Sequence, residues 1–263
     1  MIFGNGYRLA LLKHMRKIVL IIMVSICGQS AYNQSIKKKE YYEQVWLGYF
    51  NQTRLSEKWG FWFDGHLRTK DNFFDSLSSV IFRPGITYYL NDKMKFTLGY
   101  AFINFFPADN HPEISQPEHR IWQQVQWHTN YTRIRMMQWL RLEERFRRKI
   151  KDADELAAGY NFNFRVRYNF FFQVPITKKA YEKGALTYVL NDELMINFGN
   201  QIVYNYFDQN RFFTGFNYFL SKHNSIQFGY LNVFQQLSSG NKYKIINAAR
   251  IFFFQNLDFR KKP

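Results

Sequence analysis

Cysteine, acidic residues and long hydrophobic runs are all scarce in this 263-residue sequence. Its one cysteine, Cys27, excludes a disulfide framework and a cysteine-rich zinc site. The mean hydropathy is −0.41 although 46% of the residues are hydrophobic, so the apolar residues stand among polar ones. This distribution excludes a protein with several membrane-spanning helices, each of which needs roughly 20 apolar residues in succession.

Residues that favour helices are sparse as well, and aromatic residues take their place. Phe, Tyr and Trp make up 20% of the chain, whereas Leu, Ala and Glu are few. Aromatic residues favour strands, so the composition indicates a β protein. So many large apolar side chains can bury enough surface to exclude a disordered chain.

The shortage of acidic residues leaves a large positive charge. Lys and Arg number 36 against 20 Asp and Glu, which gives a formal net charge of +16. Such an excess requires an acidic partner, a charged cavity or an acidic surface nearby. We do not expect nucleic acid as that partner, because the basic residues alternate with aromatic residues instead of forming one exposed stripe. No cofactor-binding or metal-binding motif is recognisable, and we expect no cofactor.

The N-terminus has the pattern of a secretory signal. Lys13, Arg16 and Lys17 precede the apolar run 18–24, and small and polar residues follow it. We predict a signal peptide over 1–30, with Met15 as a possible true start, and one domain over 31–263. The leader carries four cations and no acid, so the mature chain would have a net charge of +12. An uncleaved anchor is the alternative.

From about residue 41 the chain alternates apolar and polar residues in segments of roughly 12 to 16 residues. In the clearest segment, Phe162, Phe164 and Val166 alternate with Asn163 and Arg165. A period of two predicts strands, and about eleven such segments are recognisable.

Strand length and the polarity of the two faces decide between β folds. Strands in soluble sandwiches average about 5 or 6 residues. Segments about twice that length, with aromatic residues outward and charged residues inward, are typical of outer-membrane barrels. We therefore predict an all-β fold, a single up-and-down antiparallel transmembrane β-barrel of about 12 strands, within a range of 10–12. Bacterial barrels have even strand numbers, so an extra strand is expected near 32–42. A soluble secreted sandwich is the alternative.

The connections between segments alternate between short and long. In bacterial barrels the short turns face the periplasm and the long loops face outward. The short connections are 53–58, 90–93, 129–131 and 221–224, and the long ones are 107–117, 148–156, 200–208 and 238–243.

The inward face of the predicted strands is rich in charged residues, and arginine outnumbers acid on it. We predict that these residues form a charge cluster in the lumen: Asp64, Arg68, Arg83, Glu118, Arg120, Arg141, Glu143, Arg145, Arg147, Arg165, Arg167, Glu193 and Arg211. Such charges must pair or face water, because an unpaired buried charge costs several kcal/mol. Two interpretations follow, an arginine–glutamate ladder that braces the wall and a lumen that attracts anions.

An enzyme is the weaker hypothesis. Outer-membrane lipid hydrolases need Ser, His and an orienting polar residue within hydrogen-bond reach. His66 and His128 are the histidines to test, but neither stands in a recognisable nucleophile motif. We expect no catalytic residues.

Several short motifs, in order, resemble a family of uncharacterised barrels common in Bacteroidetes, the domain of unknown function 2490. The likeness covers nearly all of the mature chain. The motifs include Leu55-Ser56-Glu57-Lys58-Trp59, Arg83-Pro84-Gly85-Ile86-Thr87-Tyr88, Glu118-His119-Arg120-Ile121-Trp122-Gln123-Gln124, Arg141-Leu142-Glu143-Glu144-Arg145, Asn191-Asp192-Glu193 and Asp208-Gln209-Asn210-Arg211. The resemblance implies an outer-membrane barrel and implies no activity.

Together these observations predict an exported outer-membrane barrel that is structural or a passive, anion-preferring pore or binding barrel. The expected partners are outer-membrane lipid, the barrel-assembly machinery and small anions. A closed scaffold that binds a partner through its loops, and a lipid-modifying hydrolase, are the alternatives. The oligomeric state is left open by the sequence.

Overall fold

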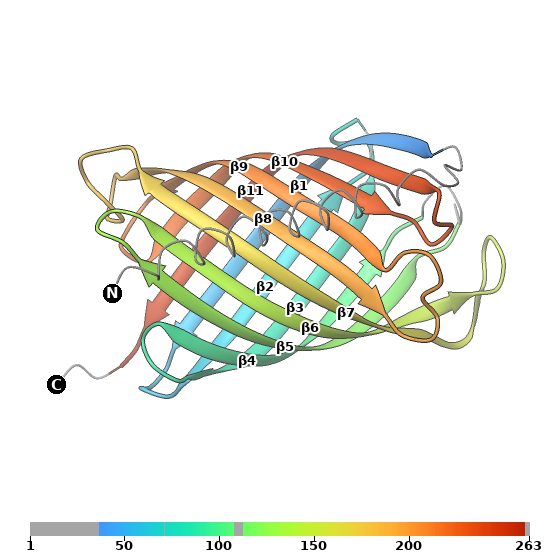
Figure 1. The fold of residues 1–263 in the computed structure, drawn as a ribbon, viewed down its shortest axis with the longest axis horizontal. Helices are drawn as coiled ribbons and strands as arrows, with labels where there is room; N and C mark the ends of the chain where they lie inside the picture. The colour runs from blue at the N-terminus through green and yellow to red at the C-terminus, as the bar shows by residue number, and fades with distance from the viewer. Residues whose placement is uncertain (1–36, 71, 108–112, 261–263) are drawn as a thin grey trace, which may run out of the picture. The chain divides into compact units, whose positions relative to one another are not determined.

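The computed structural model describes residues 37–70, 72–107 and 113–260, and Lys38–Pro263 form one compact unit. This unit is a closed barrel made entirely of strands (Figure 1). The signal peptide expected over 1–30 lies outside the described residues.

Eleven strands form the wall of the barrel in the described part of the chain, and each pairs with its neighbours in chain order. They are β1 (Lys38–Arg54), β2 (Trp59–Thr69), β3 (Leu77–Tyr89), β4 (Met94–Phe105), β5 (Gln116–Asn130), β6 (Arg135–Ile150), β7 (Leu156–Pro175), β8 (Leu186–Phe198), β9 (Phe207–Phe219), β10 (Asn224–Gln236) and β11 (Lys242–Asp258). The predicted fold class, an all-β barrel of 10–12 strands, is confirmed.

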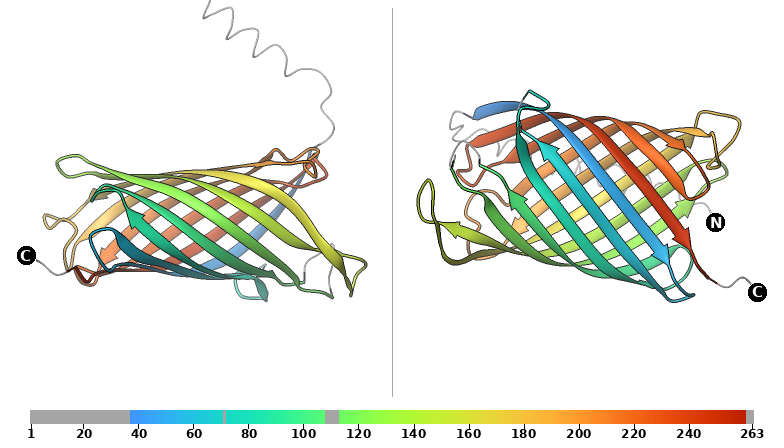
Figure 2. Two further views of the ribbon diagram at one scale, coloured as in Figure 1. Left: turned by 90° about the horizontal axis from the view of Figure 1, so that it is seen from below. Right: turned by 180° about the vertical axis from the view of Figure 1, so that it is seen from behind.

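The closure of the barrel differs from the expected even-stranded arrangement. Successive strands alternate in direction, so the first and the last of eleven strands run the same way. β1 and β11 therefore pair in parallel, from Lys38 beside Lys242 to Arg54 beside Asp258 (Figure 2). Every other pair is antiparallel. Residues 38–42, where an extra strand was expected to end, instead begin the long strand β1.

The connections separate the barrel into two ends. We call the end with connections 55–58, 90–93, 131–134, 176–185 and 220–223 the turn end. The opposite end, with connections 70–76, 106–115, 151–155, 199–206 and 237–241, is the loop end. The expected short and long connections thus fall at opposite ends. The connection 176–185, at the turn end, is a long exception.

The two faces of each strand differ in exposure, as the period of two requires. In β3, Phe82 and Ile86 are 53% and 62% exposed, whereas Arg83 and Thr87 are 5% and 1% exposed. Large apolar side chains therefore point out of the barrel, and charged side chains point into it.

The interior is not uniformly polar, which corrects the expected division between the faces. Two clusters of buried apolar residues lie inside: one includes Trp46, Phe213 and Phe252, and the other includes Trp62 and Trp122. Phe50 packs against both clusters. A barrel of this size has an interior that side chains partly fill.

One aromatic side chain in the interior depends on glycine. Gly85 and Gly99 face each other across β3 and β4, and Gly99 also lies opposite Trp122 of β5. A Cβ atom at Gly99 would lie 2.4 Å from two atoms of the Trp122 ring and 2.5 Å from the carbonyl oxygen of Pro84. Glycine is required here because the indole approaches the backbone so closely.

Candidate functional site

The predicted charge cluster lies on strands of the barrel wall, with the charged side chains inside. Ten of its thirteen members are buried: Asp64, Arg83, Glu118, Arg120, Arg141, Glu143, Arg145, Arg165, Arg167 and Glu193. Arg68, Arg147 and Arg211 are partly exposed. These positions come from β2, β3 and β5 to β9.

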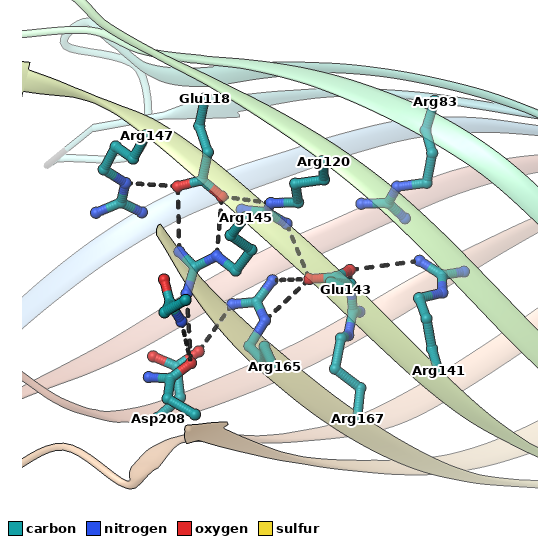
Figure 3. A network of polar contacts seen from close by, with 12 residues as sticks. Arg83, Glu118, Arg120, Arg141, Glu143, Arg145, Arg147, Arg165, Arg167 and Asp208 are labelled. Atoms are coloured by element: carbon teal, nitrogen blue, oxygen red, sulfur yellow. Dashed lines mark hydrogen bonds and ion pairs between the residues drawn. The ribbon is translucent and has the colours of Figure 1, made fainter. Parts of the chain in front are cut away.

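Glu118 is the first centre of this cluster. The carboxylate accepts two hydrogen bonds from Arg145, from Nε at 2.9 Å and from Nη2 at 3.2 Å. It also accepts one from Arg147 Nε at 2.5 Å and one from Arg120 Nε (Figure 3). Three guanidinium groups therefore surround one fully buried carboxylate.

Glu143 is the second centre. It accepts hydrogen bonds from Arg165 Nε at 2.9 Å and from Arg167 Nη1 at 2.6 Å. Arg120 Nη1, at 3.4 Å, connects this carboxylate to the group around Glu118 (Figure 3). The charged residues thus form one continuous assembly along β5, β6 and β7.

Two further carboxylates extend the assembly to β8 and β9. Arg165 Nη1 donates to Asp208 at 2.7 Å, and Arg167 Nε donates to Glu193 at 2.7 Å. Arg211 lies with Nη1 3.8 Å from Glu193. We call this set the arginine–carboxylate network; it contains Glu118, Arg120, Glu143, Arg145, Arg147, Arg165, Arg167, Glu193, Asp208 and Arg211.

Asp64 forms a smaller group on β2. Its carboxylate accepts one hydrogen bond from Trp62 Nε1 at 2.6 Å and lies 2.8 Å from His66 Nε2. Arg83 Nη1 lies 3.2 Å from the same carboxylate. Three side chains from β2 and β3 therefore surround the Asp64 carboxylate.

Arginines outnumber the carboxylates available to them. In the described part of the barrel, five buried carboxylates face ten interior arginines: Arg68, Arg83, Arg120, Arg141, Arg145, Arg147, Arg165, Arg167, Arg211 and Arg250. Arg141 Nη1 is 3.9 Å from Glu143, and Arg250 hydrogen-bonds Gln227. Arg68 stacks on Trp46, 3.7 Å from the ring centre, and lacks a carboxylate partner among the described residues.

The sequence did not identify two members of the interior, Asp208 and Arg250. Asp208 was assigned to a connection, but the register between β8 and β9 shifts at Met195 and Ile196, which pair with Gln209 and Phe207. The extra residue is Asp208, and this bulge turns it inward beside Gln209. Arg250 follows the inward period of Ile246 and Ala248, so its alternation would have identified it.

A cavity of about 340 Å³ lies inside the barrel on the turn side of the network. Seven arginines line it, namely Arg68, Arg83, Arg135, Arg141, Arg167, Arg211 and Arg250, against one carboxylate, Glu193. Two of the lining residues, Arg135 and Asn256, are exposed and lie near the turn end of β6 and β11. We call it the turn-side cavity.

The histidines considered for catalysis have partners other than hydroxyl groups. His66 contacts Asp64, and His128 Nε2 lies 2.9 Å from the amide of Gln126. Over residues 37–70, 72–107 and 113–260, no hydrogen bond joins a serine or threonine hydroxyl to a histidine ring, and no cluster of three His, Cys, Asp or Glu could hold a metal ion. No helix in the same part of the chain is long and apolar enough to cross a membrane.

A separate group of charges holds the turn end together. Arg54 Nη1 donates to Asp92 at 2.5 Å, and Arg54 Nη2 donates to the carbonyl of Glu57 at 2.8 Å. The hydrogen bond from Arg54 holds the pKa of Asp92 below its usual value. A carboxyl with a lowered pKa stabilises the fold at neutral pH, and this contribution is lost as the pH falls through the lowered value.

The fold and the site define a class: a closed all-β barrel with charged residues inside and apolar residues outside. The chain belongs to the protein family of unknown function DUF2490, whose model matches residues 43–244. It is also similar to an uncharacterized protein of Methylorubrum extorquens, with 25% identity over 167 residues. That match covers 61% of this chain and 65% of the relative. No solved structure matches the chain.

Proposed function

We propose that this protein is an outer-membrane β-barrel with a blocked, arginine-rich lumen that attracts anions. The observation that carries the proposal is the inverted polarity of the wall, in which apolar side chains are exposed and charged side chains are buried. A continuous apolar surface of this kind would promote aggregation in water, whereas lipid accommodates it.

The strand lengths support the same location. The shortest strand, β2, has 11 residues and the longest, β7, has 20. A tilted strand of about 9–11 residues crosses the hydrocarbon core of a bilayer. The N-terminal pattern of Lys13, Arg16 and an apolar run supports export by a cleaved signal, followed by insertion through the barrel-assembly machinery.

Cell fractionation tests the location. We expect the protein in the outer-membrane fraction, and we expect the folded barrel to migrate faster on gels before heating than after heating. A protein found in the soluble periplasmic fraction, with the same mobility before and after heating, would contradict the proposal and favour a soluble β protein.

A blocked lumen is favoured over an open pore because side chains from strands that are not neighbours in the wall meet inside. The arginine–carboxylate network occupies the part of the interior nearer the loop end, and Trp62 of β2 reaches Trp122 of β5, with ring centres 6.1 Å apart. Arg211 of β9 lies over Trp46 of β1 at 5.1 Å. These side chains brace the wall, because ion pairs and edge-to-face ring contacts connect strands that do not pair with each other.

Planar bilayers distinguish a blocked barrel from a pore. Because the arginine–carboxylate network and the buried aromatic clusters obstruct the lumen, purified and heat-modifiable protein is expected to give no steady current in potassium chloride. A sustained current that prefers chloride over potassium would overturn the blocked lumen and establish a passive, anion-preferring pore.

A further inference from the structure

We infer that the turn-side cavity is a binding site for a small organic anion that carries one oxyanion group, a carboxylate or a phosphate, on an aromatic or aliphatic body. This inference rests on the arginine-rich lumen of the proposed function and adds the ligand class and the residues that hold it. A volume of about 340 Å³ is within the range of small-molecule sites, roughly 300–1,000 Å³.

The charge of the cavity requires an anion. Seven arginines line it against Glu193, and Glu193 already accepts hydrogen bonds from Arg167. Guanidinium groups keep their charge in proteins, so they cannot relieve this excess by losing protons. An unpaired buried charge destabilises the protein, and a bound anion removes that cost.

Unused hydrogen-bond donors show where the oxyanion group would bind. Arg141 Nη1 and Arg250 Nε are buried and have no hydrogen-bond acceptor in the described part of the chain. Both residues line the cavity, and both are more than nine-tenths buried. Arg68 Nε is likewise without an acceptor. Guanidinium donors in a planar fork match the oxygens of a carboxylate or a phosphate.

Arg68 and Arg211 are the pair that best fits the oxyanion group. Both lie over the ring of Trp46, at 3.7 and 5.1 Å, so two guanidinium groups from β2 and β9 meet at one indole. Arg211 donates from Nε to Gln209 Oε1 at 2.9 Å, but its Nη1 lies as far as 3.8 Å from Glu193, so no carboxylate holds this guanidinium closely. Stacking on an aromatic ring holds a guanidinium in place while its donors remain available.

An apolar wall beside these arginines would take the body of the ligand. Phe50 stacks on Phe254 with ring centres 4.8 Å apart, and Phe252 lies 5.2 Å from Phe50. All three rings line the cavity, so an inorganic anion would leave this wall without a partner. Apolar walls with a few convergent polar groups are the usual composition of organic ligand sites.

The exposed residues of the lining mark where the cavity opens. Exposed Arg135 and Asn256 place its opening at the turn end, and the arginine–carboxylate network lies towards the loop end. A ligand would therefore enter from the side that the short turns face, which is the periplasm in bacterial barrels.

Titration of the detergent-solubilised, folded protein tests the site. The probes are 2-naphthoate and 2-naphthyl phosphate, with 2-naphthalenemethanol as the neutral analogue and inorganic phosphate as the bare anion. Binding is read from tryptophan fluorescence, because Trp46 and Trp62 line the cavity, and from calorimetry. We expect at least one naphthyl anion to bind saturably and at least tenfold more tightly than the alcohol and inorganic phosphate.

Variants assign the binding to the cavity. Arg68→Gln removes an arginine without an ion pair among the described residues, so the barrel is expected to fold and to bind the anion at least tenfold more weakly. Arg250→Gln is the second variant, with the same expected loss. Arg133→Gln is the matched control, because this arginine is exposed at the turn end and donates to the carbonyl of Thr177.

Three results would overturn the inference. They are equal binding of the alcohol, equal binding of inorganic phosphate, and unchanged binding in both Arg68→Gln and Arg250→Gln. Heat-modifiable migration of the same samples is scored separately. If any of these results, or no anion binding at all, is found in a heat-modifiable membrane protein, the cavity site alone is refuted, whereas anion binding by a soluble protein would refute the membrane location alone.

Discussion

Replacing Glu143 with glutamine is expected to lower the free energy of unfolding by about 3–5 kcal/mol. The substitution keeps the shape of the side chain but removes the charge that holds Arg165, Arg167 and Arg120. Glu143 is 1% exposed, so water cannot take the place of the lost carboxylate. Urea titration of the barrel refolded in lipid vesicles, followed by tryptophan fluorescence, measures the change.

Glu155→Gln is the matched control for this prediction. Glu155 also pairs with a cation, Lys151 at 2.6 Å, but both side chains are 59% exposed at the loop end. Exposed ion pairs contribute about 0–1 kcal/mol, so this variant is expected to unfold almost like the original protein. Equal losses in the two variants would mean that Glu143 is solvated and that the interior network does not brace the wall.

The fold was predictable because the pattern that determines it is local. Along 160–173, the alternation of Phe162 and Phe164 with Asn163 and Arg165 predicts a strand with two unlike faces, and β7 has that strand. The alternation marks about eleven segments, and eleven strands form the wall; the expected twelfth came from the rule of even strand numbers. The closure was less accessible, because it depends on how β1 meets β11, and these strands lie at opposite ends of the chain. A parallel closing pair leaves no local signal in either strand.

The candidate site was predictable as a set of residues but not as a set of contacts. The period of two assigns Glu118 and Glu143 to one face, and the structure buries both. Which arginine pairs with which carboxylate depends on the register between strands, as in the contact of Arg165 with Asp208. Asp208 lies at a bulge, where one extra residue reverses the alternation that the sequence shows.

Replacing Gly99 with alanine is expected to destabilise the barrel by about 3 kcal/mol, at the upper end of the usual cost of overpacking. The new methyl group would lie 2.4 Å from the Trp122 ring and 2.5 Å from the carbonyl oxygen of Pro84. Trp122 is fully buried between Trp62 and Arg141, whose guanidinium lies 4.4 Å from the Trp122 ring, so the ring has little room to move. The same urea titration measures the loss.

Gly65→Ala tests whether the loss comes from the lack of space. Gly65 also lies within a strand, but a Cβ atom there would meet its nearest neighbour, Phe63, at 3.6 Å, an ordinary contact. This variant is expected to be neutral or slightly more stable, because glycine weakens strand interiors. Gly99→Ala should cost less stability in a protein that already carries Trp122→Leu than in the original protein, because the ring that it would meet is gone. Part of the loss should thus be recovered. No recovery, or equal effects at Gly65 and Gly99, would show that the indole does not press against this glycine.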